Sequence, residues 1–430
     1  MLNRFAWNFT VSSIAGAAAT VALASVAAFP SSIDAQSEAQ TSNDVVAGAQ
    51  ISVYLVTVGP GRHVWERFGH NAIWIRDDVA GTNRAYNYGL FSFEQVGFVT
   101  RFLQGRMEYW MRGFDADLHL QGYVSDNRSV WVQELNLSAH QKVELRDFLE
   151  WNERPENRFY RYHYYYDNCS TRIRDAIDRV LGGTIYDQTK NVFPGHTLRF
   201  HSLRLVSNDF WTYTGLLLGL GQPVDEPLSA WDEMFLPLKL REHLRNVEVR
   251  GEDGSAEPLV LSERTIYESS EFVEAATPPK WTLRFLTAGL ALALVALFAA
   301  HKATEGHTGR IVFAAIATAW YALTGLVGLG LAGLWMFTDH NTSYRNENLF
   351  WFNPVAIVLV MLVPLLVLRV PWSMRVARLA AVFVAGASLL GVALQIVPGM
   401  DQVSGPLIAL AVPPNVAFAA GVLWYSSVES

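Results

Sequence analysis

Hydrophobic positions divide the chain into two parts of different character. From about residue 45 to 275, apolar and polar residues alternate over short distances, as they do in a globular domain. After residue 280 come five apolar runs, each close to or above the roughly 20 residues that cross a bilayer. The runs are 281–300, 311–337, 350–368, 379–397 and 405–424. This pattern predicts a globular domain over 45–275 and a five-span membrane domain over 281–425.

The globular part begins with segments typical of β-strands. The β-branched run ISVYLVTV (51–58) predicts a buried strand, and 71–75, 85–91 and 129–137 resemble it in length and composition. RDDVAGTN, between the second and third segments, has the Asp and Gly residues of a hairpin turn.

A helix should follow these strands. Ser138 and Gln141 form a capping box that opens it, and it should run to about Asn152, before Pro155. Strands followed by helices in one domain predict an α+β fold class.

The N-terminus and the charged loops agree on one orientation. Residues 1–35 resemble a signal peptide, with small-residue cleavage positions after Ala28 or Ala35, or else an uncleaved anchor. The first and third loops between spans are basic, whereas the second and fourth carry only Arg345. Because basic loops stay in the cytoplasm, the globular domain is expected outside it. The basic residues are Lys302, Arg310, Arg369, Arg375 and Arg378.

Composition argues against nucleic-acid binding and against a disulfide-bonded fold. The net charge of −7, with no basic stripe, argues against a nucleic-acid partner. The single cysteine, Cys169, excludes an intrachain disulfide.

Cys169 itself begins a predicted helix. Asp167 or Asn168 would cap this helix, which should stop at Gly182-Gly183. In the first turn, free backbone N–H groups and the helix dipole favour the reactive thiolate. The simpler interpretation is a small buried hydrophobic residue on the apolar stripe of the helix. A lone thiol outside the cytoplasm is exposed to oxidation, however, and this favours a catalytic role.

A thiol nucleophile needs a base and a polar group that orients the base. His70 lies at the entry to a predicted strand and is the preferred base, with His63 and His163 as alternatives. Asn87, in the strand expected to pair with that of His70, is the candidate orienting residue, unless it only satisfies backbone groups near the turn. A metal site built from His63, His70 and nearby acids lacks a known ligand spacing, so neither metal nor cofactor is expected.

Three further features stand out, and the first two each have two interpretations. Aromatic residues form either an acyl-facing wall or plain core: Phe91, Phe93, Phe98, Phe102, Tyr109 and Trp110. The polar loop with Asp339, His340 and Asn341 is either a second site or an interfacial anchor. Glycines in the second span predict a seam of close helix packing: Gly325, Gly328, Gly330 and Gly333.

Several motifs together resemble one enzyme family. YLVTVGPGRHVWERFGHNAIWI, YNYGLFSF, YDNCSTRIRDAI and WDEMFLP are similar to the extracytoplasmic domain of the Lnb-type lipoprotein N-acyltransferases. The resemblance covers about residues 50–240 and continues into FTDHN…NENLFWFNP (337–354). That domain is related to circularly permuted papain-like enzymes, NlpC-type and lecithin–retinol acyltransferase-like, in which the histidine strand precedes the cysteine helix.

The resemblance implies an activity and a location. It implies Cys169 as nucleophile, His70 as base and Asn87 as orienting residue, in the periplasm and anchored to the bacterial inner membrane. It also implies a membrane phospholipid as acyl donor and the N-terminus of a lipoprotein as acceptor. A thiol hydrolase (a phospholipase or an NlpC-type cell-wall amidase) and a non-catalytic membrane scaffold are the alternatives.

Overall fold

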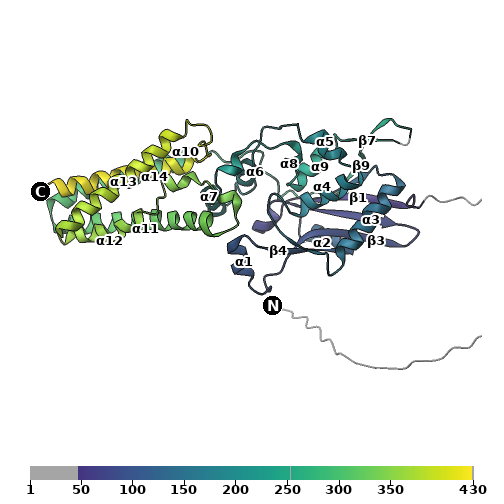
Figure 1. Ribbon diagram of the computed structural model, residues 1–430, viewed down its shortest axis with the longest axis horizontal. Coiled ribbons are helices and arrows are strands. Elements are labelled where there is room, and N and C mark those ends of the chain that lie inside the picture. Colours follow the sequence, from purple (N-terminus) through teal and green to yellow (C-terminus); the bar gives the residue numbers. More distant parts are fainter. Residues whose placement is uncertain (1–46, 252, 429–430) are drawn as a thin grey trace, which may run out of the picture. The chain divides into compact units, whose positions relative to one another are not determined.

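The N-terminal domain is built on an antiparallel sheet (Figure 1). The computed structural model describes residues 47–251 and 253–428, so the predicted signal peptide or anchor (1–35) lies outside the described residues. Within them the sheet has seven strands in the order β6-β4-β3-β2-β1-β5-β9. The strands are β1 (Ile51–Val58), β2 (His70–Asp77), β3 (Thr82–Leu90), β4 (Glu108–Asp115), β5 (Val130–Leu135), β6 (Phe159–Arg161) and β9 (Val260–Tyr267).

The four strands predicted from sequence are β1, β2, β3 and β5, and the β2–β3 hairpin is antiparallel as expected. The sequence did not reveal the other three strands, β4, β6 and β9. The reason is plain for β9, an edge strand whose side chains are almost all exposed, so that it lacks a hydrophobic alternation.

Helices cover both faces of the sheet. Side chains alternate between faces along each strand, and this alternation separates two cores. On one face, Ile73 and its neighbours pack against α3 (Ala139–Glu153) and α4 (Cys169–Val180). On the other, Trp74 and its neighbours pack against α2 (Ala116–Ser125). The domain is therefore α+β, as expected.

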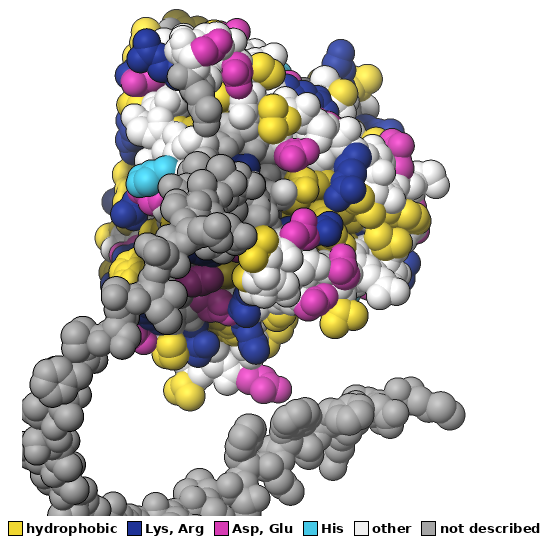
Figure 2. Space-filling view, turned by 90° about the vertical axis from the view of Figure 1, so that its right-hand side faces the viewer, with side chains coloured by type: hydrophobic (Ala, Val, Ile, Leu, Met, Phe, Trp, Pro, Cys, Tyr) yellow, Lys and Arg dark blue, Asp and Glu magenta, His cyan; other side chains and the backbone are white. Residues whose placement is uncertain are grey.

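Shorter elements complete this domain. They are α1 (Phe98–Gln104), α5 (Thr184–Thr189), α6 (Leu198–Leu205), α7 (Phe210–Gly219), α8 (Ala230–Glu233), α9 (Pro237–Leu244), the 3-10 turns η1 (Val64–Glu66) and η2 (Gln222–Asp225), and the hairpin β7 (Glu248–Arg250) and β8 (Ala256–Pro258). On the face seen in Figure 2, charged side chains of both signs are interspersed with hydrophobic ones.

The C-terminal part is helical. Among the described residues, four helices are long and apolar enough to cross a membrane: α10 (Thr282–Glu305), α11 (His307–Phe337), α13 (Pro371–Leu394) and α14 (Gly405–Val428). The predicted third span, 350–368, forms a shorter helix than expected, α12 (Ala356–Val367). It starts late because Pro354 cannot continue a helix from the preceding residues, and the Asn353 side chain accepts the Val355 N–H instead.

The loops confirm the orientation deduced from charge. The second and fourth loops both contact the sheet domain: Asp339 N–H donates to Gln104 O over 2.9 Å, and the Gln402 side chain donates to Leu220 O over 3.3 Å. These are the two loops expected outside the cytoplasm.

The glycine seam of α11 is confirmed at two positions. A Cβ at Gly325 or Gly328 would collide with backbone of residues 352–357, whereas nothing lies within 4 Å of Gly330 or Gly333.

Candidate functional site

Cys169 is the first residue of α4, directly after its cap. The Asn168 side chain accepts hydrogen bonds from the backbone N–H groups of Ser170 and Thr171, at 2.8 and 3.0 Å. The Thr171 hydroxyl accepts the Asn168 N–H in return, which completes a reciprocal capping box. Asn168 is thus the cap, and the helix ends before Gly182-Gly183 as predicted.

The backbone of WDEMFLP (231–237) accepts hydrogen bonds from the start of this helix, and this segment is called the seat of α4. Asn168 Nδ2 donates to Phe235 O over 3.0 Å, and Ser170 Oγ donates to Met234 O over 2.7 Å. One turn further on, the Arg174 guanidinium donates to Trp231 O. Three buried side chains, one from the cap and two from α4, therefore hold the helix start against one stretch of backbone, which fixes the position of Cys169.

The Cys169 sulfur is surrounded by backbone donors in an apolar setting. The N–H groups of Asn71, Cys169 and Ser170 face it and favour the thiolate. Burial outweighs them and raises the pKa of the thiol to about 11. Gly89 closes one side: its φ is +89°, and a Cβ there would lie 3.4 Å from the Cys169 Cβ. The resting side chain is therefore a neutral thiol.

His70 and Asn87 meet on neighbouring strands. Their ring Nε2 and side-chain Oδ1 are 3.0 Å apart. Asn87 Nδ2 donates to Ala85 O, so Oδ1 faces the ring, and because an amide oxygen only accepts, His70 Nε2 carries the hydrogen. Within residues 47–251 and 253–428, no group hydrogen-bonds the other ring nitrogen, Nδ1, which can therefore take a proton. Burial, with the charge of Arg128 as the second cause, lowers the pKa of His70 to about 3, so the ring is neutral at physiological pH.

The same amide oxygen binds a second histidine that the sequence analysis did not identify. His119 Nε2 lies 2.9 Å from Asn87 Oδ1 and 2.9 Å from the Tyr123 hydroxyl. Both residues are on α2, four positions apart and hence on one helix face. The four-residue spacing of His119 and Tyr123 within DLHLQGYV was the sequence feature that could have identified this pair.

Arg128 was also missed. Its guanidinium is buried, donates twice to Gly59 O at 3.1 and 3.0 Å, and lies 5.3 Å from the centre of the Tyr123 ring. Its positive charge lowers the pKa of both Cys169 and His70, though in each group burial is the larger influence. A buried cation at this point favours a thiolate and disfavours an imidazolium. No sequence pattern marks Arg128 as a site residue, because it lies in a polar turn before β5.

Asn71 connects the two residues along the chain: it directly follows His70, and its backbone N–H faces the Cys169 sulfur. Among the described residues no hydrogen bond joins Cys169 directly to His70. The two alternative bases lie in other surroundings. His63 is exposed and stacks on Trp65, and His163 contacts Asn341 through Nε2 and two backbone N–H groups through Nδ1.

Aromatic rings extend from the site to the surface. The charge of a Cys169 thiolate contributes to the raised pKa of Tyr162, after burial as the main cause, so the two groups are close. Tyr162 stacks on Tyr109 with centroids 4.1 Å apart, and Tyr109 stacks on Phe91 at 5.0 Å. Beyond Phe91 the residues become exposed. This apolar ridge comprises Trp65, Phe93, Val96, Val99, Phe102 and Leu103.

The loop after α11 forms hydrogen bonds with the apolar ridge and with the segment that precedes α4. Asp339 accepts hydrogen bonds from Arg106 and Arg161 at 2.7 and 2.8 Å. His340 donates through Nε2 to Phe102 O over 3.0 Å, and its Nδ1 contacts the Tyr164 hydroxyl. These contacts fit the anchor interpretation of the loop.

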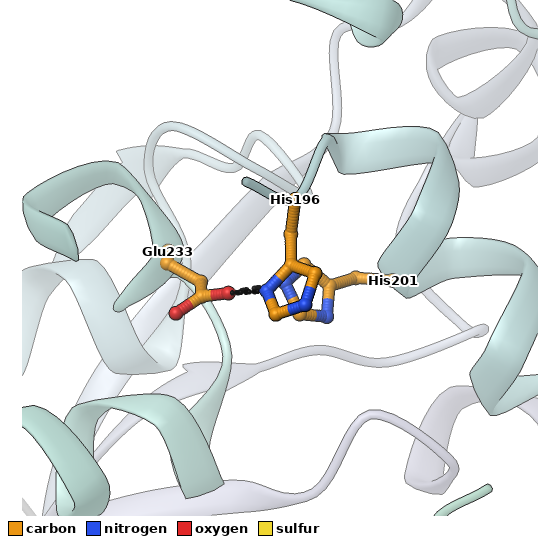
Figure 3. A group of neighbouring side chains, drawn as sticks. All are labelled: His196, His201 and Glu233. Carbon is orange, nitrogen blue, oxygen red and sulfur yellow. Dashed lines mark hydrogen bonds and ion pairs between the residues drawn. The ribbon is translucent and has the colours of Figure 1, made fainter. Parts of the chain in front are cut away.

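A histidine cluster beneath the α4 seat has ligand atoms close enough to suit a metal ion (Figure 3). Glu233 accepts from His196 at 2.6 Å and from His201 at 2.7 Å with one oxygen, and from His243 at 2.6 Å with the other. Arg204 donates to His201 Nδ1 over 2.9 Å. Since Nδ1 accepts, His201 Nε2 bears the hydrogen and presents no lone pair to a metal. The cluster is therefore better described as a buried carboxylate held by N–H donors.

Comparison with known proteins identifies both parts of the chain. Residues 38–206 match the Lnb N-terminal periplasmic domain, and residues 285–398 match the Lnb transmembrane domain. No curated protein and no solved structure gives a significant match. The two matches fit a multi-pass protein of the inner membrane with its N-terminal domain in the periplasm, and they indicate a lipoprotein-modifying enzyme. The chain therefore belongs to the Lnb family.

Proposed function

We propose that this protein is a thiol acyltransferase that moves an acyl chain from a membrane phospholipid, through a thioester on Cys169, to the N-terminal amino group of a lipoprotein. One observation carries the proposal. The only cysteine of the chain begins a capped helix and faces three backbone N–H groups, one of them from Asn71, which directly follows a histidine whose Nε2–H is bound by Asn87.

The hydrogen bond to Asn87 makes His70 Nδ1 the proton acceptor. In the first half-reaction His70 takes the thiol proton as sulfur attacks the ester carbonyl. The backbone N–H of Cys169 and the Arg128 charge are the candidate groups to stabilise the oxyanion. The C–O bond then breaks, the lysophospholipid oxygen takes the proton back from His70, and the acyl group stays on sulfur.

In the second half-reaction the acceptor amine attacks the thioester. His70 takes a proton from the amine and returns it to the departing sulfur, which leaves an amide and a free thiol. A resting thiol of raised pKa beside a neutral imidazole suits this order of events, because the proton moves only as the new bond forms. The aromatic rings from Tyr162 to the apolar ridge supply a surface for the acyl chain.

The decisive experiment uses a strain without its own lipoprotein N-acyltransferase. Wild type should convert diacyl lipoproteins into an N-acylated form detected by mass spectrometry of N-terminal peptides, and Cys169→Ala should not. With purified protein, a labelled phospholipid should leave its acyl group on Cys169 when no amine is present. An acyl adduct that forms and then passes only to water would favour the phospholipase alternative. Cleavage of cell-wall peptides would favour the amidase, and a wild-type protein inactive in every assay would favour the scaffold.

A further inference from the structure

Because helix α12 is short, the residues before it, from about 350 to 355, occupy part of the membrane domain without forming a long helix. Its 12 residues span about 18 Å, well under the ~30 Å of a hydrocarbon core. The preceding segment packs between neighbouring helices instead. Trp351 is fully buried, its carbonyl accepts from Asn415 of α14 at 2.9 Å, and the Phe350 carbonyl accepts from Ser388 of α13. Irregular backbone is tolerated among membrane helices only where protein groups satisfy it in this way.

Beside this segment lies a cavity of about 840 Å³, within the ~300–1,000 Å³ usual for small-molecule sites. Its walls are mainly apolar, with Trp335 from α11 and Phe383 and Leu390 from α13. All three side chains are exposed on helices that cross the membrane, so the cavity is open to the surrounding lipid. The groups that cover such a surface in a bilayer are acyl chains.

One end of the cavity is polar. It is lined by Arg345, Asn346, Glu347 and Asn353, all in the second, extracytoplasmic loop. Arg345 is exposed, has a left-handed backbone conformation with φ of +50°, and makes no hydrogen bond or ion pair with any described residue. Glu347 does not neutralise it, because that carboxylate is buried and bound to the side chain of Gln395 and the N–H of Gln402.

An unpaired guanidinium at the mouth of an apolar cavity is complementary to one class of membrane molecule. A phosphate accepts the planar, paired donors of arginine, and acyl chains match the walls. A diacylglycerol, or the diacylglyceryl group of a lipoprotein, has the chains without the phosphate. We propose that this cavity binds a glycerophospholipid of the outer leaflet, with an acyl chain against α11 and α13 and its phosphate at Arg345.

This lipid site is distinct from the Cys169 site, so its test does not depend on acyl transfer. Full-length Cys169→Ala protein, purified in detergent, is labelled with a photoactivatable phosphatidylethanolamine, and the cross-linked peptides are mapped. Gly386→Leu fills the cavity without a backbone clash, because Gly386 lines it and nothing lies within 4 Å of its Cβ position. Gly330→Leu is the matched control, a membrane-helix glycine with equal space that does not line the cavity.

Labelling of residues 383–390 should fall about tenfold in Gly386→Leu and stay unchanged in Gly330→Leu. Arg345→Gln should weaken phospholipid labelling by about tenfold, the size of one charge-assisted contact, and should not affect a diacylglycerol probe. Equal labelling in all variants would mean that the cavity holds only bulk lipid. Loss of a dimer on Gly386→Leu would assign the cavity to a second copy of the chain. Either result overturns the proposal.

Discussion

The His70 ring donates its Nε2 hydrogen to Asn87 Oδ1 over 3.0 Å, across two adjacent antiparallel strands. This contact selects the tautomer in which Nδ1 is the free acceptor. Asn87 is fully buried, and its amide is fixed in turn by Ala85 O, so the ring orientation is built into the sheet.

Loss of this contact should lower the rate of acyl-enzyme formation. We expect His70→Ala to reduce it by about 10²–10⁴-fold and Asn87→Ala by about tenfold, since Asn87 acts only through the ring. The double variant should be no slower than His70→Ala alone, because the two residues work as a unit. The measurement is single-turnover labelling of Cys169 by a phospholipid. Independent, multiplicative losses would contradict an orienting role for Asn87.

The raised pKa of Cys169 predicts slow alkylation in the folded protein. With a pKa of about 11, the thiolate fraction near pH 8 is about 100-fold below that of an ordinary cysteine. Iodoacetamide should therefore react about 100-fold more slowly than with the unfolded chain, and the rate should rise about tenfold per pH unit between about pH 8 and 10. Arg128→Gln should slow the reaction further, since the guanidinium lowers this pKa. A rate that levels off below pH 8 would show that the resting thiol is already ionised.

Gly89 offers a test of close packing at the nucleophile. Gly89 and Gly183 share a φ of +89°, so alanine at either position should cost about 1–2 kcal/mol of backbone strain. Only the new methyl group at position 89 would contact Cys169. We expect similar losses of thermal stability from the two variants, but slower acylation of Cys169 only in Gly89→Ala. Equal acylation rates would mean that this side of the sulfur is not used.

The apolar ridge should insert into the outer leaflet, because His340 and Asp339, just after the membrane helix α11, bind the backbone of α1. Cys169→Ser gives a cysteine-free background for spin labels. A label at Val99 (68% exposed) should be accessible to oxygen and shielded from a water-soluble nickel reagent in reconstituted protein. A label at Leu118 of α2 (71% exposed) is the control and should show the opposite. Equal accessibility at both positions would place the ridge in water.

Glu233 should stabilise the seat of α4. Burial opposes its charge, but hydrogen bonds from His201, His243 and His196 hold its pKa well below the usual range. Glu233→Gln breaks a buried charge network, which typically costs about 3–5 kcal/mol. Thermal unfolding should show this loss, and Cys169 alkylation should become faster as the helix start loosens. Glu263→Gln is the control: its carboxylate also binds several donors, but it is partly exposed and its partners are Gln133, Arg241 and Arg245, none of which belongs to the seat, so Cys169 reactivity should not change.

Local sequence patterns determined much of this protein. The β-branched run of β1, the capping box at Ser138 and the cap at Asn168 all depend on neighbours a few residues apart, and each formed as predicted. Four of the five apolar runs after residue 280 also formed long apolar helices. The same holds for the orientation, because loop charge is a local property of the chain. The contact of His70 with Asn87 was predictable because the hairpin places Asn87 opposite Ala72, two residues from His70 and on the same face of β2.

Only the tertiary structure identified the residues whose role depends on partners far away in the sequence. Arg128 became part of the site because its guanidinium lies over the Tyr123 ring and donates to Gly59 O, and neither contact follows from a periodic pattern in the sequence. WDEMFLP became the seat of α4 through hydrogen bonds that span about 60 residues. The short α12 reflects a balance between hydropathy, which is continuous across 350–368, and the packing of Trp351 and Asn348 among three helices. Hydropathy reports the preference of a segment for lipid, but side-chain partners from other helices decide where its backbone can leave the helix.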